Sequence, residues 1–175
     1  MATNPVEVLW PTFAKPMLED TYANTAIGAL TATYFFAIAF GASLSPHVSK
    51  LFKRHHAKTL AASFTCLAAV QIILALQGHI LAFAAVFILY SICLGICETP
   101  ASSILHRCVE DHQRSTLLSL RSLIQQLGAA LGLLLVGSVA EVYSTPVAWS
   151  LGAVFLLLAA VLCLVLVKRV TTQRQ

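Results

Sequence analysis

Apolar residues along this chain fall into five long runs separated by short polar stretches. A helix rises about 1.5 Å per residue, so about 20 apolar residues cross the hydrocarbon core of a bilayer. We therefore predict five membrane-spanning helices, at about residues 24–45, 59–77, 80–98, 115–140 and 147–167. Pro46 is expected to end the first span. The third span either stops at residue 98 or continues through Pro100 towards Arg107, since membrane helices tolerate proline.

The segment before the first span, residues 1–22, mixes polar and apolar residues and carries three prolines, Pro5, Pro11 and Pro16. Proline removes a backbone donor, so no long helix is expected here. We interpret the segment as extracytoplasmic or as the end of a preceding helix. Its aromatic residues are expected to lie at a membrane interface: Trp10, Phe13 and Tyr22.

Composition supports an all-α membrane helix bundle. Of the 175 residues, 58% are apolar and only 10% are charged, whereas soluble domains carry about 25% charged residues. Residues 23–175 are therefore predicted to form a single integral membrane domain. The N-terminal residues show no basic stretch followed by an apolar core, so no cleavable signal peptide is predicted.

The distribution of Lys and Arg predicts the orientation of the bundle. The connection after the first span carries Lys50, Lys53, Arg54 and Lys58 with no acid, and the connection after the third span and the C-terminal tail are also basic. The turns at residues 77–79 and 141–146 have no Lys or Arg. The positive-inside rule then places the N-terminus outside and the C-terminus in the cytoplasm of a multi-pass plasma-membrane protein. The net charge of +4 is read as this topology signal, and no nucleic-acid partner is predicted.

The spans differ in where they carry polar residues. The second and fifth are apolar around almost the whole helix and are expected to face lipid. The fourth has a single polar and small-residue stripe at helical spacing: Arg114, Arg121, Gln125, Gly128 and Gly132. A bundle with two outer helices and two or three inner ones implies a polar path or a partner.

Reactive residue types do not form a recognisable catalytic or metal site. Cys93 and Cys97 are spaced four residues apart, but metal ligation there would require charged thiolates in lipid, and the alternative is that they act as small hydrophobic residues. His55, His56, His106 and His112 are interpreted as loop residues in solvent. No nucleophile-and-base pair lies in the spans, so no enzyme, metal or cofactor is predicted.

The order of features after Pro100, with HRCVEDHQRSTLLSLRSLIQQLGAALGLLLVGSVAEVYS, resembles the C-terminal half of a major facilitator superfamily transporter. The resemblance covers nearly the whole chain, as family helices eight to twelve without the N-terminal half, and is nearest to the multidrug and proton-antiport branches. It implies a central cavity lined by the eighth, tenth and eleventh helices, with the ninth and twelfth facing lipid.

The family's cytoplasmic signature after its eighth helix is a glycine, an acid and several basic residues. Here the matching residues are Gly41, Lys50, Lys53 and Arg54. The sequence departs from the signature at Ser45-Pro46, where the family has an acid.

Glu98 is the main candidate for a functional carboxylate, because an acid within the bilayer costs about 2–3 kcal/mol at mid-depth. One hypothesis is a cavity residue that binds a cation or exchanges protons. The alternative is an ion pair with Arg107, Arg114 or Arg121 that holds the third and fourth spans together. Glu98→Gln separates the two hypotheses in an intact transporter, since only the first requires a change in transport and in its pH dependence.

The other candidate residues also have two interpretations each. Arg107, Arg114, Arg121, Lys50, Lys53 and Arg54 are expected to anchor the helices at the cytoplasmic headgroups or to form part of a cytoplasmic gate. Gln125 and Gln126 lie deeper, and one of them is expected to face the cavity or to bond to another helix. Gly128 and Gly132 permit close helix packing. Two residues of the first span are candidates for lining the outer cavity: Thr31 and Tyr34.

These observations lead to a hypothesis of partial secondary transport. The chain is expected to move small molecules such as drugs or metabolites using an ion gradient, and to need a complementary N-terminal half. Five spans with the N-terminus outside suggest a chain that lacks its beginning. The alternative is a non-transporting membrane subunit or a truncated gene fragment.

Overall fold

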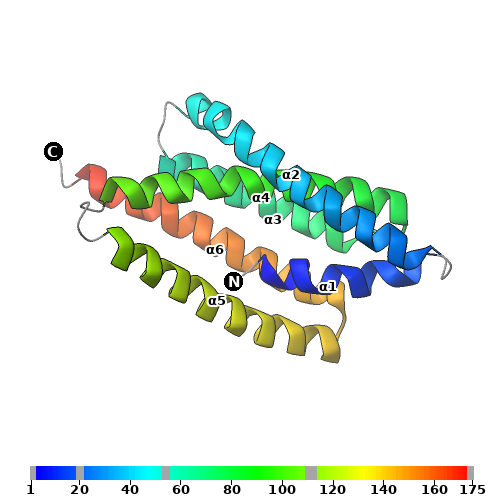
Figure 1. Ribbon diagram of the computed structural model, residues 1–175. Helices are drawn as coiled ribbons and strands as arrows, with labels where there is room; N and C mark the ends of the chain where they lie inside the picture. The colour runs from blue at the N-terminus through cyan, green and yellow to red at the C-terminus, as the bar shows by residue number, and fades with distance from the viewer. Residues whose placement is uncertain (1–2, 19–21, 53–55, 109–113, 173–175) are drawn as a thin grey trace.

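The computed structural model describes residues 3–18, 22–52, 56–108 and 114–172. In this part the chain forms six α-helices and one short 3₁₀ helix, η1 (Lys15–Met17). The α-helices are α1 (Asn4–Ala14), α2 (Ala23–Leu51), α3 (His56–Ala75), α4 (Ile80–Cys108), α5 (Arg114–Val142) and α6 (Thr145–Thr172). The long helices run alternately up and down one bundle (Figure 1).

Helices α2 to α6 are each long and apolar enough to cross a membrane, judged by length and composition. The predicted all-α bundle with five spans is therefore confirmed. The helix of the third span passes through Pro100 and ends at Cys108, while its candidate membrane-spanning part is Ile80–Cys97. Pro100 is almost completely buried, which fits a proline held by the packing of neighbouring helices.

The prediction that Pro46 ends the first span is wrong, since α2 continues through it to Leu51. Proline inside a helix removes one backbone hydrogen bond and crowds the preceding turn. In α2 the residue before it, Ser45, is fully buried, and its Oγ donates a 2.9 Å hydrogen bond to the carbonyl of Ile96 in α4. This bond holds α2 against α4 directly before the proline, and sequence alone does not reveal such a contact.

The proline-rich N-terminal segment contains an 11-residue helix, α1, where no long helix was expected. Pro5 lies in the first turn, where a backbone N–H has no partner within the helix and its loss costs nothing. Glu7 lies in the same turn, where its negative charge interacts favourably with the positive end of the helix dipole. Figure 1 shows α1 beginning about halfway along the bundle and ending near the start of α2. The helix buries Val6, Trp10 and Ala14 against the other helices.

The aromatic residues of α1 belong to the core, so their predicted place at a membrane interface is wrong. Trp10 packs on Phe87 of α4 with ring centroids 4.8 Å apart. Phe13 packs on Trp149 of α6 at 4.9 Å and on Phe83 of α4 at 5.7 Å. Aromatic rings prefer such offset contacts to lipid when partners of the right shape are present. These contacts attach α1 to both α4 and α6.

Helix α3 lies at the centre of the bundle, packed against α4 on one side and α6 on the other. In α3, 56% of the apolar span is buried inside the protein, whereas the buried share is 33% in α4 and α6 and 11% in α2 and α5. The second span was expected to be an outer, lipid-facing helix, but more than half of it is buried against its neighbours in this chain. A helix that is apolar on every side suits a lipid environment and a protein interior equally well, so its pattern does not decide between them.

Helices α2 and α4 cross at very short distance. A side chain at Gly41 would run into the backbone carbonyl of Ile92, and one at Gly95 would run into that of Ile38. The α2 side of this crossing is a stripe of small buried residues at four-residue spacing: Ala37, Gly41, Ser45 and Ser49. Small residues permit this approach in membranes. Gly41 therefore belongs to the middle of a packed helix, and its assignment to the cytoplasmic signature is wrong.

Helices α2, α4 and α6 all end at the same end of the bundle, where α3 and α5 begin (Figure 1). Lys50 lies in the last turn of α2, and Arg114 begins α5. The basic residues of separate connections thus belong to one end of the molecule. This arrangement agrees with the predicted orientation, in which that end lies in the cytoplasm.

Candidate functional site

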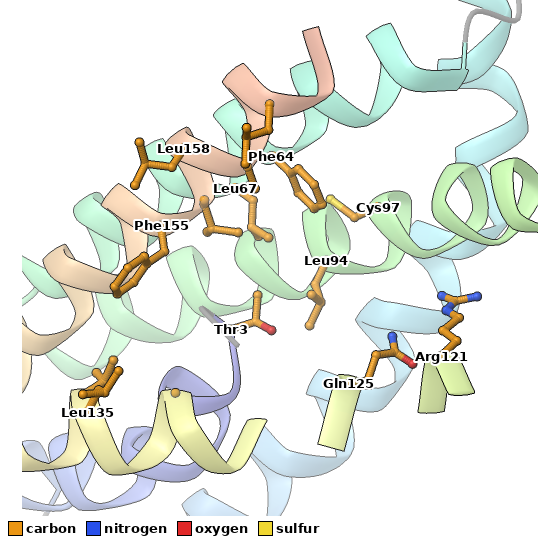
Figure 2. A pocket seen from close by; sticks show the side chains of 15 residues that line it. Thr3, Phe64, Leu67, Leu94, Cys97, Arg121, Gln125, Leu135, Phe155 and Leu158 are labelled. Atoms are coloured by element: carbon orange, nitrogen blue, oxygen red, sulfur yellow. The ribbon is translucent and has the colours of Figure 1, made fainter. Parts of the chain in front are cut away.

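A large cavity lies between α5 and the group formed by α3, α4 and α6. It has a volume of about 580 Å³. Most of its lining is apolar, with polar side chains at a few positions (Figure 2). The lining residues that Figure 2 labels are Thr3, Phe64, Leu67, Leu94, Cys97, Arg121, Gln125, Leu135, Phe155 and Leu158.

Arg121 and Gln125 supply the main polar groups of this cavity. They are four residues apart on α5, and Figure 2 shows both side chains pointing from α5 towards α4. Arg121 is half-buried, and its side chain is engaged in an interaction. Gln126, the next residue along, is exposed and does not belong to the described lining. Of the two glutamines between which the sequence left the choice open, Gln125 is the one at the cavity.

The small residues of the α5 stripe follow the same face. Gly128 and Gly132 are both buried, and Gly132 lines the cavity together with Val136. Helix α5 packs against α6 and more lightly against α1. Glycines at these two positions leave room for a neighbouring helix to approach α5 closely, as predicted for them.

A second polar group joins α1, α2 and α4. The hydroxyl of Tyr34 hydrogen-bonds to the carboxylate of Glu7, and its ring stacks on Phe87 with centroids 5.6 Å apart. Tyr90, which is completely buried, lies near Glu7 and Tyr34. Its hydroxyl has no hydrogen-bond partner among the described residues. The sequence pattern indicated Tyr34 but not Glu7. The available signal was an acid two residues after Pro5, between the apolar Val6 and Val8.

The two candidates from the first span therefore lie outside the larger cavity. Thr31 is half-buried, and its Oγ1 donates a 2.8 Å hydrogen bond to the carbonyl of Ile27 in its own helix. Tyr34 bonds to Glu7, as above. Neither belongs to the described lining of the cavity next to α5, and their role in an outer cavity stays a prediction.

Gln71 is a buried polar residue that sequence reasoning missed in the second span. It is completely buried, and its Nε2 donates a 2.8 Å hydrogen bond to the backbone carbonyl of Trp149. Its Oε1 and the Nε1 of Trp149 have no partners among the described residues. A single glutamine in the run LAAVQIIL was the available signal. The bond joins α3 to α6, because an amide within an apolar bundle needs a partner.

Several candidate residues fall wholly or partly outside the described structure. Lys53 and Arg54 lie outside the described residues. Glu98, Arg107 and Arg114 belong to described helices, but their side chains are not part of the description. Lys50 is described and exposed. The hypotheses for these residues stay predictions.

Within the described residues there is no group of three or more His, Cys, Asp or Glu side chains placed to hold a metal ion. The two cysteines singled out by spacing, Cys93 and Cys97, lie on α4. The sulfur of Cys93 lies 3.8 Å from that of Cys66 on α3, a partner that the spacing did not indicate. Cys97 lines the larger cavity.

Five spanning helices with a mostly apolar cavity are features of membrane transport proteins, and a comparison with known families decides the assignment. The sequence profile described as Major Facilitator Superfamily matches residues 3–175. The chain belongs to the major facilitator superfamily. Members of this superfamily are transporters and not enzymes, so this chain is a multi-pass protein of a transporter family. No curated protein and no solved structure matches the chain.

Proposed function

We propose that this superfamily member forms one wall of a substrate path in a secondary transporter that exports small, largely apolar molecules. The observation that carries the proposal is the cavity of about 580 Å³ between α5 and the other helices, with Arg121 and Gln125 pointing into it. Binding sites for small molecules have volumes of about 300–1,000 Å³ and combine an apolar lining with a few placed polar groups. The cavity fits both criteria.

A polar residue of α5 supports the proposal that a second protein half packs against this helix. Gln125 is exposed in this chain, about 11 residues or about 16 Å from the start of a spanning helix. Polar side chains at such depth face protein or water more often than lipid. We propose that a complementary N-terminal half covers this side of α5, so that the two halves enclose the substrate path.

We propose further that an ion gradient drives the transport, that substrates are drugs or metabolites, and that the protein resides in the bacterial inner membrane. Support for the ion gradient comes from the family and from the sequence, in which no nucleotide-binding loop occurs. Glu98 is the proposed coupling carboxylate. Its substitution Glu98→Gln should then change transport and the pH dependence of transport.

The test of the cavity is the substitution Gln125→Ala in cells that also supply the complementary half. Nile red, a neutral apolar dye with hydrogen-bond acceptors, serves as the transported probe, and its efflux is followed by fluorescence. The net value of one hydrogen bond is about 0.5–1.5 kcal/mol, so we expect efflux to fall about 2- to 10-fold. A protonophore should abolish the efflux that remains.

Gln126→Ala is the matched control, since it removes the same amide one residue away from the cavity lining. It should leave efflux within about twofold of the unsubstituted protein when both are present in equal amounts. Equal losses in the two variants would contradict the proposed path. Absence of any efflux with the complementary half present would favour the alternative, a membrane subunit that does not transport.

A further inference from the structure

Two thiols from neighbouring helices meet beside a second cavity. Cys66 of α3 and Cys93 of α4 have their sulfur atoms 3.8 Å apart, close enough for an S–H···S contact. Both are free cysteines, Cys66 exposed and Cys93 buried. They are 27 residues apart in the chain, so their meeting results from the packing of α3 on α4.

The cavity next to these thiols has a volume of about 280 Å³ and is formed by three helices. Its lining is mainly apolar and consists of Val48, Phe52, Ala62, Ser63, Cys66, Cys93 and Ile96. An apolar cavity of about 150 Å³ is enough to bind benzene. One aromatic ring therefore fits beside the sulfur pair.

The geometry points to a dithiol site: we propose that Cys66 and Cys93 together bind an uncharged, apolar compound of a soft, trivalent metalloid, such as an arylarsenoxide. Thiol sulfur prefers soft partners. Two bonds of about 2.3 Å, the length found in metal–thiolate centres, join sulfurs 3.8 Å apart at an angle of about 110°. Small rotations of the two cysteine side chains can narrow this angle, so neither helix needs to move.

The bonding step balances without an oxidant or reductant. The arsenic–oxygen bond of the arylarsenoxide breaks, two arsenic–sulfur bonds form, and both thiol protons leave with the oxygen as one molecule of water. Arsenic stays trivalent, and the product carries no charge. A zinc ion, by contrast, needs thiolates and further ligands, and no third ligand stands near the pair among the described residues.

The location also suits this ligand class. The cavity lies towards the end of the bundle where α2 ends and α3 begins, which the predicted orientation places on the cytoplasmic side. Thiols stay reduced in the cytoplasm. An apolar arylarsenoxide enters from the bilayer, and Cys66 is exposed to receive it. The site does not depend on the proposed transport function, because its cavity differs from the one next to α5.

The first test measures retention of phenylarsine oxide by the full chain in reduced membranes after washing with a monothiol. Two linked bonds raise apparent affinity by a factor of about 100 or more over one bond. We therefore expect Cys66→Ser and Cys93→Ser each to weaken retention about 100-fold. Cys163→Ser and Cys97→Ser are the matched controls and should retain the probe as the unsubstituted chain does.

The second test detects the bridge between α3 and α4 directly and does not rely on a substitution of cysteine. A protease site is inserted in the turn at Gln77–Gly78, and the chain is cut after the probe has bound. The two fragments should migrate together on a denaturing gel and separate when an excess of a small dithiol is added. Separate fragments despite a bound probe would place the bridge between Cys93 and Cys97 within α4, and would overturn the proposal. Retention that survives Cys66→Ser would overturn it as well.

Discussion

Gly95→Leu is expected to separate α2 from α4 and to destabilise the protein strongly. Any side chain at this position meets the backbone of Ile38 and Ala42, which cannot rotate away as a flexible side chain does. Overpacking usually costs about 1–3 kcal/mol, and the cost here should reach or exceed the upper figure because two helices must move apart. The hydrogen bond from Ser45 to Ile96 would be lost in addition.

The measurement is the apparent unfolding temperature of the protein in detergent, followed by circular dichroism. Gly28→Leu is the matched control, since Gly28 lies on α2 and has no atom within 4 Å of the position of an added side chain. The control should unfold within a few degrees of the unsubstituted protein. If both variants lost stability equally, the effect would come from glycine within a helix and not from the α2–α4 crossing.

Trp149→Ala is expected to destabilise the bundle by about 3–5 kcal/mol, the usual cost of removing a large aromatic side chain from a packed interior. Trp149 is completely buried, and its ring packs on Phe13 and Phe83. The substitution leaves the backbone carbonyl that accepts the hydrogen bond from Gln71, so the loss reports packing. The expected consequence is loosening of α1 together with α6.

Phe36→Ala provides the comparison for this substitution, because Phe36 is 78% exposed on α2. Its removal should change the unfolding temperature little. Limited proteolysis near α1 provides a second measurement, since cleavage should be faster in Trp149→Ala only. An unchanged cleavage rate would show that Trp149 does not hold α1 in place.

The residues of α1 show why part of the fold escaped prediction from sequence. Two prolines lie within it and a third, Pro16, follows it, and by local rules such spacing indicates an interrupted segment. The helix is nevertheless present because Pro5 occupies the first turn and because Val6, Trp10 and Ala14 find buried contacts on other helices. Those contacts involve residues 70 or more positions away, such as Phe83 and Phe87, and no local pattern contains them.

The candidate site was predictable to the extent that it lies on one helix. Arg121, Gln125 and Gly132 were selected by helical spacing, and all three line the larger cavity. Glu7 and Gln71 were not selected, because each is a single polar residue whose partner lies on another helix. The pair formed by Cys66 and Cys93 was missed for the same reason.

The sequence by itself determined that this protein is an all-helical membrane bundle, with five spans close to their observed positions. Length and apolarity suffice for that conclusion, because each span must satisfy its own backbone hydrogen bonds in lipid. Only the tertiary structure decided which helix lies at the centre, since apolar residues look alike whether they meet lipid or protein. It also decided that α2 continues past Pro46 and that Cys66 meets Cys93, because both depend on contacts between helices that are distant in the chain.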